Sequence, residues 1–144
     1  MGTYLVRGGK RIEGEFAVRG SKNAALPILA ACVLAADEVV LENLPQIRDV
    51  SQTLEILREL GCSVTLTGRT AVIDSREMQV TARFGETVRK MRSSILFLGA
   101  MLGRSGAGRI AYPGGCAIGK RPIDLHLAAF RRMGVSIAEE NEIL

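Results

Sequence analysis

Aromatic residues, histidine and cysteine are all scarce in this 144-residue sequence. Aromatic residues make up 4% of the chain and are not clustered, so it lacks the stacking platforms with which proteins bind single-stranded nucleic acid. The sequence has three cysteines, an odd number, and no Cys-x-x-Cys pair. This argues against a disulfide framework and a zinc site. We therefore expect reduced thiols, no bound metal and no nucleic-acid partner.

Long apolar runs are also absent. No stretch is long enough to span a bilayer, and the basic residues near the N-terminus are not followed by the hydrophobic core of a signal peptide. We therefore expect a soluble, cytoplasmic protein with no membrane partner. The 47% hydrophobic share allows a sizeable core in a chain of single-domain length. The net charge of +4 is spread along the sequence, which favours small anionic ligands over nucleic acid.

Apolar periodicity and turn residues divide the first half into short elements. Residues 3–7 and 13–18 alternate around a glycine-containing turn and predict a hairpin. Helical spacing of apolar residues begins at Lys22, with Pro27 tolerable near the helix start. The elements then expected are a helix to residue 36, a strand over 39–41, a helix over 46–60 that Gly61 caps, and a hairpin of strands 62–67 and 70–74.

The second half repeats this plan, with a helix over 92–102, an extended segment over 109–112, and a helix over 122–133 followed by Gly134. Leu34 aligns with Leu102, whereas Leu60 aligns with Met133, so the spacing grows from 68 to 73. This repeat predicts five inserted residues in the loop around Cys116. By the same alignment residues 136–138 match the strand at 63–65, and the sequence stops inside a hairpin. We therefore expect the N-terminal part of a longer protein.

The enlarged loop, residues 113–122, places a thiol among glycines and next to two cations. Lys120 and Arg121 offer charge-assisted donors to phosphate or carboxylate, which indicates cysteine chemistry on an anionic substrate. The loop also resembles a phosphate-binding P-loop, but Arg121 and Pro122 follow Lys120 where that motif needs a magnesium-binding hydroxyl. A P-loop is the lesser alternative. Cys32 and Cys62 lie at positions typical of core residues, and the single histidine, His126, is expected to be structural.

Three motifs together resemble one known family. They are Lys22-Asn23-Ala24-Ala25-Leu26-Pro27, the pair Met91-Arg92, and the loop Gly114-Gly115-Cys116-Ala117-Ile118-Gly119-Lys120-Arg121-Pro122. The sequence is similar over nearly its whole length to UDP-N-acetylglucosamine enolpyruvyl transferases (1-carboxyvinyltransferases). These enzymes transfer the enolpyruvyl group of phosphoenolpyruvate to the sugar 3-hydroxyl with release of phosphate, in the first committed step of peptidoglycan synthesis. No metal or organic cofactor is implied.

The resemblance also implies roles for single residues. Lys22 and Asn23 would contact phosphoenolpyruvate, and Arg92 would help to bind substrate. Cys116 would be the general acid and the thiol that fosfomycin alkylates. Neighbouring Lys120 and Arg121 should lower the thiol pKa from about 8.5 in the free protein. The residues that would hold the nucleotide sugar are Arg121, Pro122, Ile123, Asp124 and Leu125.

The implied fold is α/β, an inside-out barrel of βαβαββ-like repeats in two lobes that this chain would contain incompletely. Residues 1–21 would be a hairpin of the second lobe, and residues 22–144 about two of three repeats of the first. Without the remainder of its chain, we expect the protein to be inactive. The shikimate-pathway enolpyruvyl transferase, which has no such cysteine loop, and a non-catalytic sugar-nucleotide binding module are the alternatives.

Overall fold

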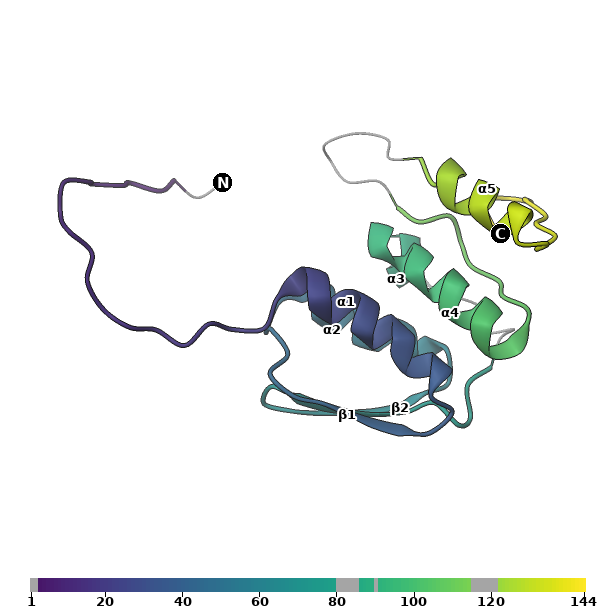
Figure 1. Cartoon of the computed structure of the whole chain (residues 1–144), viewed down its shortest axis with the longest axis horizontal. Coiled ribbons are helices and arrows are strands. Elements are labelled where there is room, and N and C mark those ends of the chain that lie inside the picture. Colours follow the sequence, from purple (N-terminus) through teal and green to yellow (C-terminus); the bar gives the residue numbers. More distant parts are fainter. Residues whose placement is uncertain (1–2, 80–85, 90, 115–121) are drawn as a thin grey trace.

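The computed structural model describes residues 3–79, 86–89, 91–114 and 122–144. Residues 3–19 run away from the helices as an exposed arm (Figure 1), and no strand forms among them. The prediction of two paired strands here is therefore wrong for this chain. A two-stranded hairpin is marginal in water without a packed face, and Tyr4, Ile12 and Phe16 all point into solvent.

The first unit consists of two helical segments above a three-stranded sheet (Figure 1). Its sheet has the order β1-β3-β2, antiparallel throughout. Val39, Ile73 and Val64 lie side by side across the three strands on the face toward the helices. The elements are α1 (Lys22–Ala31), a 3-10 turn (Cys32–Leu34), β1 (Glu38–Leu41), α2 (Arg48–Glu59), β2 (Ser63–Thr67) and β3 (Thr70–Asp74).

These elements confirm the sequence-based expectations for residues 22–74, with ends displaced by one or two residues. The helix that contains Pro27 continues past it. Gly68 adopts a φ of 60° in the two-residue turn between β2 and β3, as a type II′ hairpin turn requires of its first central residue. Gly61, with a φ of 87°, follows α2 and donates its N–H to the Arg58 carbonyl.

The second unit begins with a short helix and repeats the helical pair of the first. The predicted helix over 92–102 starts as a 3-10 turn and extends to Ser105, where Gly106 ends it with a φ of 67°. In place of its expected strands, the described part of this unit has two isolated bridges, from Ile143 to Ala111 and from Ile143 to Glu140. The elements are α3 (Glu86–Arg89), a 3-10 turn (Arg92–Ser94), α4 (Ile95–Ser105) and α5 (Asp124–Arg132).

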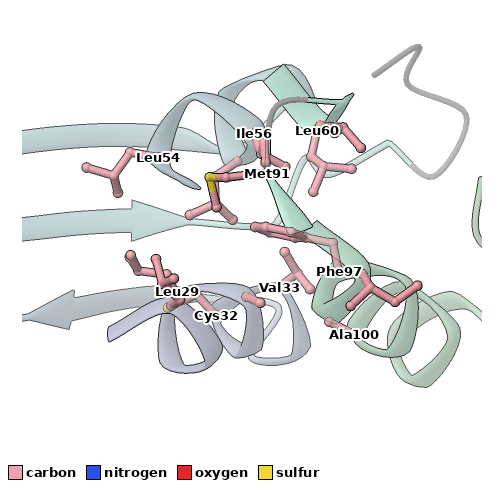
Figure 2. Close-up of a cluster of buried hydrophobic side chains, with 14 of the residues drawn as sticks. Leu29, Cys32, Val33, Leu54, Ile56, Leu60, Met91, Phe97 and Ala100 are labelled. Atoms are coloured by element: carbon pink, nitrogen blue, oxygen red, sulfur yellow. The ribbon is translucent and has the colours of Figure 1, made fainter. Parts of the chain in front are cut away.

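One hydrophobic core joins the two units. Figure 2 shows Leu29 and Val33 from α1 and its 3-10 turn, Ile56 from α2 and Phe97 from α4 meeting in it. α4 buries five residues on this core, whereas α5 buries Leu127 alone. α4 therefore belongs to the core of the first unit as much as to the second.

Candidate functional site

The first residues of α1 carry two predicted ligands, Lys22 and Asn23. Ser21 precedes them in extended conformation, and its carbonyl accepts the Ala25 N–H at 2.9 Å, but its side chain makes no capping hydrogen bond. Ser21 therefore supplies no side-chain acceptor to the first-turn amides of α1. Uncapped amides at a helix N-terminus form a binding position for an anionic group. Lys22 and Asn23 are both exposed at this end.

The start of α1 is fixed by close packing at Gly20. A Cβ added there would lie 2.1 Å from the Asn43 carbonyl oxygen and 3.1 Å from Cδ of Pro45, so no larger residue fits. Arg69 in turn holds this loop, since its guanidinium donates to the Asn43 side chain and its carbonyl accepts the Leu44 N–H at 2.9 Å. The turn of the β2-β3 hairpin thus sets the position from which α1 departs.

Arg92 lies at an equivalent place in the second unit, as the first residue of the 3-10 turn before α4. The buried Ser94 hydroxyl donates to the Met91 carbonyl at 2.6 Å and to the Val88 carbonyl at 3.2 Å, which fixes the backbone on either side of Arg92. The Arg92 side chain is exposed. Within residues 3–79, 86–89, 91–114 and 122–144, no carboxylate forms an ion pair with it.

The cysteine loop is described at its two ends alone. Cys116, Lys120 and Arg121 lie outside the described residues. Pro122 is exposed and lines an open hollow of about 750 Å³ together with Tyr112 and Pro113.

The helix expected from residue 122 starts at Asp124 instead. Ile123 precedes it as a buried cap residue whose carbonyl accepts the Leu127 N–H at 3.1 Å. Asp124 suits the positive end of the helix. The exposed residues here are Pro122, Asp124 and Leu125, so among the described part of the predicted sugar stretch Ile123 alone serves the core.

α1, α4 and α5 run in the same direction in Figure 1. The predicted ligands lie at the starts of these helices. Lys22 is the first residue of α1, Arg92 begins the 3-10 turn before α4, and Asp124 is the first residue of α5. α1 also packs directly against α4. In this view the positive dipole ends of the three helices therefore point the same way.

The two described thiols are buried, as expected. Burial raises the pKa of Cys32 and of Cys62 to about 11, and the Cys32 thiol donates to the Ile28 carbonyl at 3.4 Å. Both are unpaired. A thiol with so high a pKa holds little of the nucleophilic thiolate at neutral pH.

Sequence reasoning missed one charged residue of this site. Asp49, in the first turn of α2, lies 2.8 Å from the Lys22 ammonium, measured from Oδ1 to Nζ. An acid in a first helical turn usually serves the helix itself. The sequence predicted both helices within the first repeat. It did not show that their N-termini meet.

Comparison with known proteins decides the family. The model of the EPSP synthase (3-phosphoshikimate 1-carboxyvinyltransferase) family matches residues 6–144. The chain belongs to this family. Among curated relatives, UDP-N-acetylglucosamine 1-carboxyvinyltransferase 2 of Caldanaerobacter subterraneus is 45% identical over 139 residues, covering 96% of this chain and 33% of its own. UDP-N-acetylglucosamine 1-carboxyvinyltransferase 1 of Symbiobacterium thermophilum is 48% identical, covering 94% and 32%.

This member of the EPSP synthase family thus spans about a third of the length of the curated relatives it matches. A solved structure, the enolpyruvyl transferase NikO from Streptomyces tendae, superposes on 94% of this chain and 30% of its own with a TM-score of 0.72 and 24% identity. That likeness confirms the expected fold, a partial α/β enolpyruvyl-transferase architecture.

No three His, Cys, Asp or Glu side chains in the described part of the chain are grouped so as to hold a metal ion. Among the same residues, no helix has the length and apolar character needed to cross a membrane.

Proposed function

We propose that the full-length protein transfers the enolpyruvyl group of phosphoenolpyruvate to the 3-hydroxyl of UDP-N-acetylglucosamine and releases phosphate. The observation that carries this proposal is the 43–48% identity, over 94–98% of this chain, to relatives named for that reaction. The exposed Lys22 and Arg92 and the uncapped start of α1 agree with a substrate that carries a carboxylate and a phosphate.

Each predicted ligand has a role in this reaction. Lys22 and the first-turn amides of α1 would hold the phosphate or carboxylate of phosphoenolpyruvate, with Asn23 reaching toward the sugar. Arg92 would add a second fixed cation. Charges fixed before the reaction stabilise the charge that develops in the transition state without the cost of reorganising solvent. Arg121 and residues 122–125 would bind the nucleotide sugar.

Cys116 would supply the proton to the enol methylene, as the general acid of the reaction. In the free protein, Lys120 and Arg121 would lower its thiol pKa and make it a nucleophile. Bound anionic substrate would raise the pKa again, so the thiol could donate its proton. We place the reaction in the cytoplasm, where the unpaired thiols of Cys32 and Cys62 stay reduced.

Fosfomycin labelling of the full-length protein tests the role of Cys116. We expect one covalent adduct, located on Cys116 by peptide mass spectrometry, because Cys32 and Cys62 are buried and hold their protons. The Cys116→Ala variant should take up none, whereas the matched control Cys62→Ala should be labelled like the parent. An unmodified Cys116 favours the shikimate-pathway enzyme. A titration of the Cys116 thiol that shows no downward pKa shift contradicts the proposed nucleophile.

A coupled phosphate assay separates the three candidate functions. Release of phosphate from phosphoenolpyruvate that depends on UDP-N-acetylglucosamine supports the proposal. Release that depends on shikimate 3-phosphate instead supports the shikimate-pathway enzyme. Binding of the nucleotide sugar without phosphate release from either acceptor indicates a binding module.

A further inference from the structure

The ion pair between Lys22 and Asp49 joins the starts of two helices. Lys22 is the first residue of α1 and Asp49 the second of α2, and their charged atoms are 2.8 Å apart. The pair is partly open, with side-chain exposures of 49% for Lys22 and 35% for Asp49. A ligand can therefore reach the ammonium from the solvent side while Asp49 holds it from the other.

Asp49 is the more firmly held partner. Its carbonyl accepts a hydrogen bond from the Thr53 hydroxyl at 2.8 Å, and its carboxylate lies at the positive end of α2. Thr53 is buried, as are Val50 and Leu54 on the same helix. Lys22 has a flexible four-carbon side chain instead. The geometry thus places a short carboxylate side chain, on a helix backbone held by packing, against a longer and more mobile cation.

The same helix, α2, also contacts the residue that precedes Arg92, the second predicted cation. The Thr53 hydroxyl lies 3.9 Å from the sulfur of the buried Met91, the residue before Arg92. The first two turns of α2 therefore contact Lys22 through Asp49, and Met91, the residue before Arg92, through Thr53. No residue of α2 was among the predicted ligands.

We infer that Asp49 is a positioning residue, which holds the Lys22 ammonium at the start of α1 in the orientation that an anionic substrate meets. This inference rests on the proposed function, since it presumes that Lys22 binds phosphoenolpyruvate. A positioned cation loses less side-chain freedom on binding, which favours affinity. A carboxylate at this place also has an opposing effect, because its charge repels an anionic substrate.

Kinetics of Asp49 variants in the full-length protein decide between these effects. If Asp49 positions Lys22, Asp49→Ala should raise KM for phosphoenolpyruvate by about three- to tenfold, the effect of freeing one long side chain. KM for the nucleotide sugar should change little, and Asp49→Glu should restore part of the loss. If Asp49 acts by repulsion alone, Asp49→Ala lowers KM, and the inference is overturned. An unchanged KM overturns it as well.

Glu55→Ala is the matched control, because Glu55 is an acid of the same helix that pairs with Arg58 on the surface. It should leave both KM values unchanged, and melting temperatures of all variants should show that they fold. A parent protein without transferase activity contradicts the proposed function instead. In that case the inference is tested by the rate at which an amine-reactive ester labels Lys22, read by peptide mass spectrometry. Asp49→Ala should increase this rate relative to Glu55→Ala, and an equal rate overturns the inference.

Discussion

The two units of this chain end their second helices with the same hydrogen bonds. After α2 and after α5 a glycine adopts positive φ, at 87° for Gly61 and 90° for Gly134. In each case the glycine N–H bonds to an arginine carbonyl and the next N–H to the carbonyl before it, as in a Schellman motif. The bonds are Gly61 to Arg58 at 2.9 Å, Cys62 to Leu57 at 3.0 Å, Gly134 to Arg131 at 3.0 Å and Val135 to Phe130 at 3.0 Å.

The units differ in what covers these helix ends. Leu60, before the first glycine, is fully buried, whereas its repeat partner Met133 is 78% exposed. In the first unit a three-stranded sheet closes the core. In the second, an open hollow of about 790 Å³ is lined by the matching positions, among them Leu98, Met133, Val135 and Leu144.

This difference separates local from long-range causes. Helices, glycine caps and two-residue turns depend on residues a few positions apart, and both units form them. Closure of the core needs strands that pair over larger distances in sequence. The second unit has begun that pairing, since Ile110 and Leu144 exchange hydrogen bonds at 2.9 and 2.8 Å. Its isolated bridges place Ile143 between Ala111 and Glu140, as β3 lies between β1 and β2 in the first unit, but its apolar layer is uncovered.

Truncating the two matched apolar residues should show the largest contrast. Leu60→Ala leaves a cavity in a closed core, so we expect a loss of about 2 to 4 kcal/mol in the free energy of unfolding of this chain. Met133→Ala removes a side chain that is mostly in water, and we expect a change within about 0.5 kcal/mol. Denaturant unfolding measures both. Similar losses for the two variants would mean that the second unit buries Met133 in solution.

Alanine at the two capping glycines should show a smaller contrast. Both variants place a Cβ in the left-handed region, which costs roughly 1 to 2 kcal/mol. At Gly61 the added Cβ would also lie 3.2 Å from the Glu77 carbonyl oxygen, whereas at Gly134 nothing lies within 4 Å. Gly61→Ala should therefore be the more destabilising in the same unfolding experiment. A greater loss for Gly134→Ala would contradict the view that the second helix end is open.

The sequence predicted the elements that local rules fix. Helical periodicity located α1, α2 and α4, and the glycines marked the cap of α2 (Gly61), the turn between β2 and β3 (Gly68) and the cap of α5 (Gly134). It also placed Cys32 and Cys62 correctly in the core. The start of α5 was predicted two residues early because proline at residue 122 is as compatible with the position before a helix as with its first turn.

Contacts between distant segments could not be predicted in this way. The packing of Gly20 on the Asn43 carbonyl depends on where two loops meet, and Gly20 alone is indistinguishable from a turn glycine. The pairing of Lys22 with Asp49 depends on the relative placement of α1 and α2. The strands predicted at 3–7 and 13–18 have the alternating pattern, but the described residues provide no partner for their apolar side chains. The role of Cys116 stays a prediction, because the residue lies outside the described part.

The smallest contrast concerns a matched arginine in the last turn of α2 and of α5. Arg58 donates to the Val64 carbonyl at 3.2 Å, a bond between helix and strand whose acceptor is uncharged. Its repeat partner Arg131 donates to the Glu139 carboxylate at 2.7 Å, and the Tyr112 hydroxyl donates to the same carboxylate at 2.9 Å. The hydrogen bond from Arg131, followed by that from Tyr112, lowers the pKa of Glu139 below its ordinary value.

In the second unit, the contact of Arg131 and Tyr112 with Glu139 should therefore depend on pH. Because the folded pKa of Glu139 is depressed, its contribution to stability is present above the ordinary carboxyl pKa and is lost as pH falls through the folded value. The effect on stability is small, since the pair is exposed and screened. An NMR titration of the Glu139 carboxyl group measures it directly. Arg131→Leu should raise this pKa most, Tyr112→Phe less, and the matched control Arg58→Leu not at all; a pKa unchanged by Arg131→Leu would show that the contact does not persist in solution.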